Sequence, residues 1–156
     1  MSPPSPFPSG IEVRLISAEE TIPLRLAVLR PGRPRDSAIF PGDDASCTRH
    51  YGAFRYGRLL SIASLYRAEL PEKPGKEGYQ LRGMATEAAA RNQGLGRALV
   101  IACVEFARSQ HVPILWCNAR VTAVDFYRKL EFETIGPEFV IPDVGPHFRM
   151  WRKLKE

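Results

Sequence analysis

The sequence contains no apolar run near the roughly 20 residues that a membrane-spanning helix requires, so no membrane protein is predicted. It has no run of five or more basic residues, which argues against a dedicated nucleic-acid-binding arm. Its three cysteines, Cys47, Cys103 and Cys117, are odd in number and show no C-x-x-C spacing. We expect reduced thiols, two of them in the core, in a cytoplasmic protein.

Residues 1–10 lack the basic start of a secretory signal, and four of them are proline. A disordered lead-in is expected there, followed by a single domain over residues 11–156. The composition, 44% hydrophobic and 25% charged, is that of a globular protein that folds without disulfides or metal. The net charge of +5 implies an anionic partner; nucleic acid, an acidic peptide and a polyphosphate cofactor all remain open.

The hydrophobic pattern predicts strands and helices in alternation. Residues 11–16 alternate as a half-buried strand, and Ser17 with Glu20 forms a capping-box pattern. The helix that follows should run through Leu29, with a kink or late start at Pro23. Further strands are expected at 48–55, 59–66, 79–86, 114–117, 134–141 and 148–153, and helices at 94–110 and from the expected N-cap Thr122 to about residue 130. This order predicts an α/β protein with a mixed, partly parallel sheet.

The segment Arg91-Asn92-Gln93-Gly94-Leu95-Gly96-Arg97 lies between a predicted strand and a strongly predicted helix. A helix N-terminus presents unpaired backbone N–H groups and partial positive charge, and glycines let a phosphate approach the backbone. No Lys-Ser or Lys-Thr follows the second glycine, so this is not a Walker motif, and the glycine spacing does not match a dinucleotide-binding fingerprint. The segment is a candidate phosphate site, and a plain loop-to-helix turn is the alternative.

Two motifs in the right order give the chain a family resemblance. Residues 81–86 followed by 91–99 resemble the acyl-CoA-binding motif of GNAT N-acyltransferases, whose pattern is Q/R-x-x-G-x-G/A. Residues 123–132 resemble the A-x-x-F-Y-x-K-x-G-F segment of the same family. The resemblance is strongest over residues 81–132 and implies a central sheet of about six to seven strands with helices on both faces.

The resemblance also implies roles for individual residues. The backbone at Met84, Ala85 and Thr86 would pair with the pantetheine arm of acetyl-CoA. The segment Arg91, Asn92, Gln93, Gly94, Leu95, Gly96 and Arg97 would hold the pyrophosphate, through the amides of Gln93, Gly94, Gly96 and Arg97. Asn118, where the sheet should splay, would hydrogen-bond the pantetheine arm. Neither a metal nor a covalent enzyme intermediate is required.

The implied chemistry is direct attack of a neutral amine on the thioester. A backbone N–H near Met84 or Ala85 would stabilise the oxyanion, and Tyr127 would protonate the leaving thiolate as general acid. Tyr127 also lies on a predicted apolar face, so packing is its alternative role. Glu87 is the candidate general base, with a solvated loop carboxylate as the alternative.

Three further features of the sequence indicate a role less specifically. His147, in the predicted Gly145-Pro146-His147-Phe148 turn, is a candidate residue on the acceptor side, and it ranks above His50 because the final hairpin usually borders that site in the family. Cys117 is expected to be a core thiol rather than a nucleophile. Glu131 stands where the family usually has glycine with positive φ, so the helix is expected to end differently here.

The leading hypothesis is an N-acetyltransferase that moves an acetyl group from acetyl-CoA to a primary amine of a small molecule or peptide. Asp36, Asp43 and Asp44 lie in the predicted long loop 30–46, a candidate wall of the substrate site, and would attract a cationic amine or merely solubilise the loop. A non-catalytic acyl-CoA sensor is the alternative. Nucleic-acid binding lacks a basic stripe with interleaved aromatics, and a homodimer is possible for this family.

Overall fold

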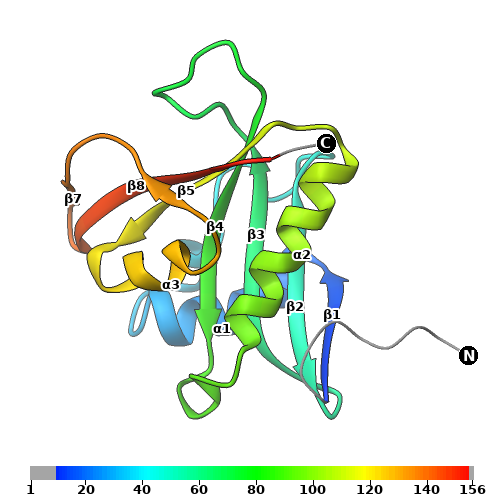
Figure 1. Ribbon diagram of the computed structural model, residues 1–156. Helices are drawn as coiled ribbons and strands as arrows, with labels where there is room; N and C mark the ends of the chain where they lie inside the picture. The colour runs from blue at the N-terminus through cyan, green and yellow to red at the C-terminus, as the bar shows by residue number, and fades with distance from the viewer. Residues whose placement is uncertain (1–9, 155–156) are drawn as a thin grey trace, which may run out of the picture. The chain divides into compact units, whose positions relative to one another are not determined.

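The computed structural model describes residues 10–154, so most of the expected Pro-rich lead-in lies outside the described residues. The strands are β1 (Ile11–Ile16), β2 (Arg49–Arg55), β3 (Arg58–Arg67), β4 (Gly78–Thr86), β5 (Ile114–Arg120), β6 (Glu133–Thr134), β7 (Phe139–Ile141) and β8 (Gly145–Lys153) (Figure 1). The α-helices are α1 (Ala18–Leu24), α2 (Leu95–Ser109) and α3 (Val124–Arg128). A π-helix, η1 (Arg25–Leu29), and three 3-10 helices, η2 (Arg35–Ala38), η3 (Ala88–Ala90) and η4 (Val121–Ala123), complete the order.

The strands form one mixed sheet. Hydrogen bonds join them in the order β1-β2-β3-β4-β5-β8-β6, and β7 pairs with β8. The β4–β5 pair is parallel, whereas β1–β2, β5–β8, β6–β8 and β7–β8 are antiparallel. This confirms the predicted α/β class with a mixed sheet flanked by helices. The strand predicted at 134–141 is instead two short strands, because Gly136 with a φ of 80° and Pro137 interrupt it.

The chain divides into two compact units. The first comprises residues up to Ser64 together with Gly83–Ala102, and the second comprises Leu65–Arg82 together with residues from Cys103 onward. The hairpin of β2 and β3 turns at Tyr56 and Gly57, whose φ values of 51° and 77° give a type I′ turn. Predicted from the sequence at this position, the hairpin is confirmed.

The first helix begins as predicted and ends in an unusual way. The Ser17 hydroxyl accepts from the Glu20 N–H at 3.1 Å, and the Glu20 carboxylate accepts from the Ser17 N–H at 2.9 Å, which confirms the capping box. Pro23 lies inside α1 and supplies no N–H to the helix. The chain then continues as the π-helix η1, closed by the Arg30 N–H donating to the Arg25 carbonyl at 2.9 Å.

In the second unit, β5 and β8 pair along seven residues, from Ile114↔Lys153 to Arg120↔His147. This long antiparallel partner extends β5 three residues beyond the predicted end at Cys117 and places Gly145, Pro146 and His147 in β8 instead of a turn. The predicted N-cap Thr122 is wrong as well. The 3-10 helix η4 precedes α3, and the Val124 N–H bonds the Val121 carbonyl.

Glu131 ends the α3 segment in the left-handed region, with a φ of 69°. The Phe132 N–H donates to the Tyr127 carbonyl at 3.1 Å and the Glu131 N–H to the Arg128 carbonyl at 3.0 Å, which is the Schellman pattern. The expectation that the helix ends differently is therefore wrong. Arg152 compensates, because it pairs with the Glu131 carboxylate at 3.0 Å and donates to the Leu130 carbonyl at 3.1 Å.

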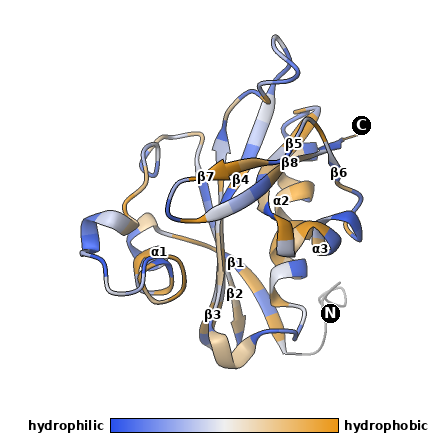
Figure 2. Ribbon diagram, turned by 90° about the vertical axis from the view of Figure 1, so that its left-hand side faces the viewer, coloured by the Kyte–Doolittle hydropathy of each residue, from blue (hydrophilic) through white to orange (hydrophobic). Residues whose placement is uncertain are grey.

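Burial follows the predicted apolar faces. In α2 the buried residues are Leu95, Ala98, Leu99, Val100, Cys103, Val104 and Ala107. In the second unit a cluster of Leu70, Ile114 and Trp116 packs with Trp151, while α3 shows both hydrophobic and hydrophilic segments (Figure 2). Among residues 10–154, no helix has the length and apolarity to cross a membrane.

Candidate active site

The segment predicted to bind phosphate forms the turn that starts α2. Arg91, Asn92 and Gln93 are exposed, and Asn92 and Gly94 have φ values of 63° and 84°. The Ala98 N–H donates to the Gly94 carbonyl at 3.1 Å, so the amides before Ala98 belong to the first turn, which has no acceptor within the helix. The turn therefore combines the first-turn amides of a 15-residue helix with a glycine in the left-handed region. These features fit the pyrophosphate of an acyl-CoA.

Two arginines of the β2–β3 hairpin hold this part of the chain. The Arg55 Nη1 donates to Gln93 Oε1, and the Gln93 Nε2 donates to the Ala89 carbonyl at 3.5 Å. The Arg58 Nη2 donates to the Glu87 carboxylate at 2.8 Å. Sequence reasoning did not identify Arg55 or Arg58 as partners, because they lie 38 and 29 positions from the residues that they contact. Glu87, the candidate base, is thus an ion-paired carboxylate.

Met84, Ala85 and Thr86 form the end of β4. Met84 and Thr86 are half-buried and Ala85 is buried. The Ser61 hydroxyl contacts both the Ala85 carbonyl at 3.2 Å and the Thr86 hydroxyl at 2.7 Å. Just before them, Gly83 has a φ of 65°, and a Cβ added there would lie 3.2 Å from the ring of Phe40. This left-handed residue interrupts regular strand geometry directly before the three residues.

Tyr127 lies on α3 and is buried among aromatic rings. Its ring centroid is 5.1 Å from that of Phe126 and 5.4 Å from that of Phe132. Burial raises the pKa of the Tyr127 phenol well above its ordinary value, and the neighbouring thiols Cys117 and Cys103 raise it further, with a hydrogen bond to Cys117. The phenol is therefore protonated throughout the neutral range.

Cys103 and Cys117 are core thiols, as predicted, while Cys47 is exposed. Burial raises the pKa of the Cys103 thiol to about 12 and that of Cys117 to about 12. The hydrogen bond from Tyr127 opposes the shift at Cys117. Neither thiol is ionised near neutral pH, so neither has the thiolate character of a nucleophile.

Asn118 contacts Arg149, which in turn contacts Glu72, and the sequence singled out neither of these two residues. The Oδ1 of Asn118 accepts from the Nε of Arg149 at 3.1 Å. The Nη1 of Arg149 in turn donates to both carboxylate oxygens of Glu72, at 3.0 and 3.2 Å. The spacing of His147, Arg149 and Trp151 along one strand was the signal available, because alternate residues of a strand share a face.

The two candidate histidines have different surroundings. His147 is buried in β8, its Nδ1 donates to the Gly145 carbonyl at 2.7 Å, and its ring lies 5.9 Å from Phe139. In the neutral form, this bond leaves Nε2 as an acceptor. His50 is buried between the Asp43 carbonyl at 2.9 Å and the Ser64 hydroxyl at 2.7 Å.

His50 belongs to a buried network centred on Arg25. Arg25 is fully buried, and its guanidinium donates to the Asp43 carboxylate at 2.7 and 3.1 Å, to the Ala38 carbonyl at 2.9 Å and to Ser64 Oγ at 2.9 Å. The guanidinium also lies 3.9 Å from the Phe40 ring centroid. The interpretation of Asp43 as attracting a cationic amine is therefore wrong, because its carboxylate is buried and paired. Asp36 and Asp44 are exposed.

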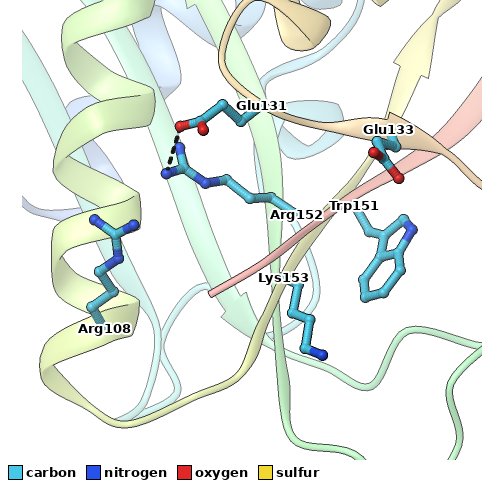
Figure 3. Close-up of a pocket in the computed structure, with 6 residues that line it drawn as sticks. All are labelled: Arg108, Glu131, Glu133, Trp151, Arg152 and Lys153. Atoms are coloured by element: carbon cyan, nitrogen blue, oxygen red, sulfur yellow. Dashed lines mark ion pairs between the residues drawn. The ribbon is translucent and has the colours of Figure 1, made fainter. Parts of the chain in front are cut away.

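A pocket of about 360 Å³ lies near the end of α2 and is lined by Arg108, Glu131, Glu133, Trp151, Arg152 and Lys153 (Figure 3). Arg152 and Glu131, two of these lining residues, form an ion pair at 3.0 Å. None of the predicted site residues lines this pocket. Among residues 10–154, no group of three or more His, Cys, Asp or Glu side chains is arranged to hold a metal ion.

Comparison with known proteins identifies the family. The family model of the Acetyltransferase (GNAT) domain matches residues 45–150. The chain is 34% identical over 145 residues to the "Uncharacterized N-acetyltransferase YitI" of Bacillus subtilis (strain 168), covering 93% of this chain and 97% of that protein.

Solved structures share the fold at low identity. One is the "histone acetyltransferase HPA2 and related acetyltransferase" of Corynebacterium glutamicum ATCC 13032, with a TM-score of 0.77, 17% identity and coverage of 94% and 98% of the two chains. Another is FeeM, an N-acyl amino acid synthase from uncultured soil microbes, with a TM-score of 0.72, 15% identity and coverage of 92% and 91%. The family match, the relative in Bacillus subtilis and the shared fold lead to one conclusion: the chain is an acyltransferase that belongs to the GNAT family of N-acetyltransferases.

Proposed function

We propose that the chain, as a single domain over residues 11–156, transfers an acetyl group from acetyl-CoA to a primary amine of a small molecule or peptide. Acetyl-CoA, the co-substrate of the family, supplies the acyl thioester. The observation that carries the proposal is the start of α2. There the residues that resemble the family motif supply a glycine in the left-handed region and the first-turn amides of the helix. The odd number of cysteines, without C-x-x-C spacing, supports a reducing, cytoplasmic compartment.

The pyrophosphate would be held by the amides of Gln93, Gly94, Gly96 and Arg97, within the segment that also contains Asn92 and Leu95. Arg91 and Arg97 are exposed and would add positive charge at the same helix end. The hydrogen bond from Arg55 to Gln93 limits the motion of the turn before the ligand binds. Such preorganisation reduces the entropy that binding must overcome.

The backbone of Met84, Ala85 and Thr86 would pair with the pantetheine arm, and Asn118 would donate its amide N–H to the same arm. Because the Asn118 Oδ1 already accepts from Arg149, its amide nitrogen is left to act as the donor. An N–H at Met84 or Ala85 would stabilise the oxyanion.

Tyr127 would act as general acid for the departing thiolate. Burial raises the pKa of the Tyr127 phenol, which keeps it protonated until negative charge develops on the sulfur beside it. Glu87 would accept the proton of the ammonium, directly or through water, once its pair with Arg58 opens. Replacement of Tyr127 by Phe is the direct test of the acid, and loss of about 100-fold or more in turnover is expected.

The proposal is tested first by thermal unfolding with acetyl-CoA, dephospho-CoA and ATP. At about 100 times its dissociation constant, a ligand stabilises the folded state by about 2.7 kcal/mol, which for a domain of this size raises the midpoint by several degrees. Arg91→Gln should weaken the shift, whereas Arg108→Gln, at the other end of α2, serves as the matched control. The absence of any shift at millimolar acetyl-CoA would reject the site.

A further inference from the structure

One face of the β5–β8 ladder carries polar and aromatic side chains, of which the proposed function uses only Asn118. Residues directly opposite in an antiparallel pair point to the same side of the sheet. The pairs Trp116↔Trp151, Asn118↔Arg149 and Arg120↔His147 therefore share one face, which we call the ladder face. The other face carries buried residues such as Cys117 and Met150.

Arg149 is a cation of the ladder face that several contacts hold in place. Asn118 fixes its Nε, the Glu72 carboxylate fixes its Nη1, and the rings of Trp116 and Phe139 lie 5.5 and 5.4 Å from its guanidinium carbon. Its side chain is still 23% exposed. Its Nη2 makes no hydrogen bond within the described part of the chain. The guanidinium is thus held in one orientation with donors to spare.

The surroundings of Arg149 favour an anion. Gln80 of β4 is the parallel partner of Trp116, so Arg82, two residues on, continues the ladder face, where it lies 5.4 Å from the Tyr66 ring. Arg82, Arg120, Arg149 and Lys73 outnumber the carboxylates of Glu72 and Glu133 around this face. A planar guanidinium fixed between rings matches a carboxylate in geometry as well as charge.

Glu72 shows that a carboxylate fits beside Arg149. It comes from the connection between β3 and β4, not from the sheet, and its side chain is 30% exposed. Both of its oxygens contact the same guanidinium nitrogen. A ligand carboxylate would share the guanidinium through Nη2 or replace Glu72.

We propose that the acceptor is an amine that also carries a carboxylate, such as an amino acid, and that Arg149 binds this carboxylate. The inference rests on the proposed function, because Asn118, the proposed partner of the pantetheine arm, is hydrogen-bonded to Arg149. Such binding would bring the acceptor next to the residue that contacts the donor. Nearby guanidinium groups also disfavour an ammonium ion, which would help the amine to lose its proton before attack.

The test compares amines that differ only by a carboxylate: L-phenylalanine with 2-phenylethylamine, L-methionine with 3-(methylthio)propylamine, and β-alanine with ethylamine. Release of free thiol from saturating acetyl-CoA gives kcat and KM for the full chain. We expect kcat/KM to be at least about 10-fold higher for the carboxylate member of the preferred pair. Aminoethylphosphonate, a further substrate, should react more slowly than β-alanine.

Arg149→Met should abolish the preference, mainly by raising KM for the carboxylate compounds, and Arg149→Lys should restore part of it. Arg67→Met is the matched control, because Arg67 also pairs with a glutamate, Glu77 at 3.0 Å, and lies 5.2 Å from a ring, that of Tyr79. Arg67→Met should leave the preference unchanged.

The proposal is overturned if the members of each pair react equally, if the phosphonate is preferred, or if Arg149→Met slows both series to the same extent. If no compound is acetylated, thermal shifts by the same carboxylates decide: a shift that Arg149→Met removes supports the site, and its absence overturns it. This readout needs no acetyl-CoA. A failure of acetyl-CoA to bind is therefore distinguishable from a failure at Arg149.

Discussion

Two arginines of this protein make similar contacts in opposite surroundings. Arg25 and Arg149 each donate twice to a carboxylate, and each lies over an aromatic ring, Phe40 at 3.9 Å and Phe139 at 5.4 Å. The side chains of Arg25 and Asp43 are 0% and 5% exposed, whereas those of Arg149 and Glu72 are 23% and 30% exposed. The degree of burial is the difference on which the comparison turns.

Burial decides what each pair can do. A sealed pair has lost its hydration, so each partner depends on the other, and removing one leaves an uncompensated charge. A half-exposed pair keeps access to water and contributes little to stability. The buried, or sealed, pair of Arg25 and Asp43 therefore anchors residues 38–43 to η1. The half-exposed, or open, pair of Arg149 and Glu72 is able to exchange partners and so to bind a ligand.

The substitution Arg25→Met should have the largest effect and tests whether burial separates the two pairs. The substitution keeps much of the side-chain volume but strands the Asp43 carboxylate in the interior, so a loss of about 3–5 kcal/mol in the free energy of unfolding is expected. Urea denaturation measures it, with Glu72→Gln as the matched control in the open pair, for which less than about 1 kcal/mol is expected. Should Arg25→Met fail to fold, Asp43→Asn, which keeps hydrogen-bonding atoms in place, provides the measurement. Similar losses in the sealed and open pairs would remove the distinction.

A second buried region, around Tyr127, should make the free energy of unfolding depend on pH in the alkaline range. The pKa of Cys103 and Cys117 is raised from 9.0 to about 12 and that of Tyr127 well above 10.0, all by burial. A pKa that is higher in the folded than in the unfolded state means that the unfolded chain loses its protons first. Stability is then complete below about pH 9 and falls as the pH rises towards 12, by up to about 1.4 kcal/mol per pH unit for each group.

Chemical denaturation between pH 7 and pH 11 measures this fall. Cys47→Ser is the control, because Cys47 is exposed and its removal should leave the profile unchanged. A free energy of unfolding that stays constant up to pH 10.5 would contradict the burial of the thiols.

The smallest effect is expected at the pair of Glu131 and Arg152, in which the Glu131 side chain is 76% exposed and the Arg152 side chain 15% exposed. Glu131→Gly relieves the left-handed conformation, which disfavours a residue with a Cβ by about 1 kcal/mol, and loses a surface pair of smaller value. A gain of about 0.5 kcal/mol is expected from urea denaturation. Glu131→Gln, which keeps the strain and loses the charge, should be slightly destabilising. A loss above 1 kcal/mol for the glycine variant would place Arg152 among the structural anchors.

Features encoded by neighbouring residues could be predicted from the sequence. The capping box needs only Ser17 and Glu20, the hairpin only its turn, and α2 only its apolar spacing, and all three are confirmed. The sequence likewise predicts the turn at the start of α2, because a glycine-containing motif fixes its position. The roles of its residues in binding remain predictions.

Features that depend on distant partners could not be predicted. The burial of Arg25 depends on Asp43 and Ser64, which lie 18 and 39 positions away, so the local sequence around Asp43 indicates only a loop acid. The length of β5 depends on its partner β8. Arg149 carries no motif, and its surroundings come from Glu72, 77 positions away.

The π-helix after Pro23 should make insertions and deletions within residues 25–29 unfavourable during evolution. A π turn amounts to one residue inserted into an α-helix, and each residue rotates an α-helix by about 100°. Deleting one residue within Arg25–Leu29 would restore regular helix but redirect the side chains on one side of the deletion relative to the other, including the guanidinium that anchors residues 38–43. The exposed residues 31–34 have no such constraint. Insertions and deletions among homologous chains should therefore accumulate at 31–34 and avoid 25–29, so that the loop can vary in length while Arg25 keeps its place in η1.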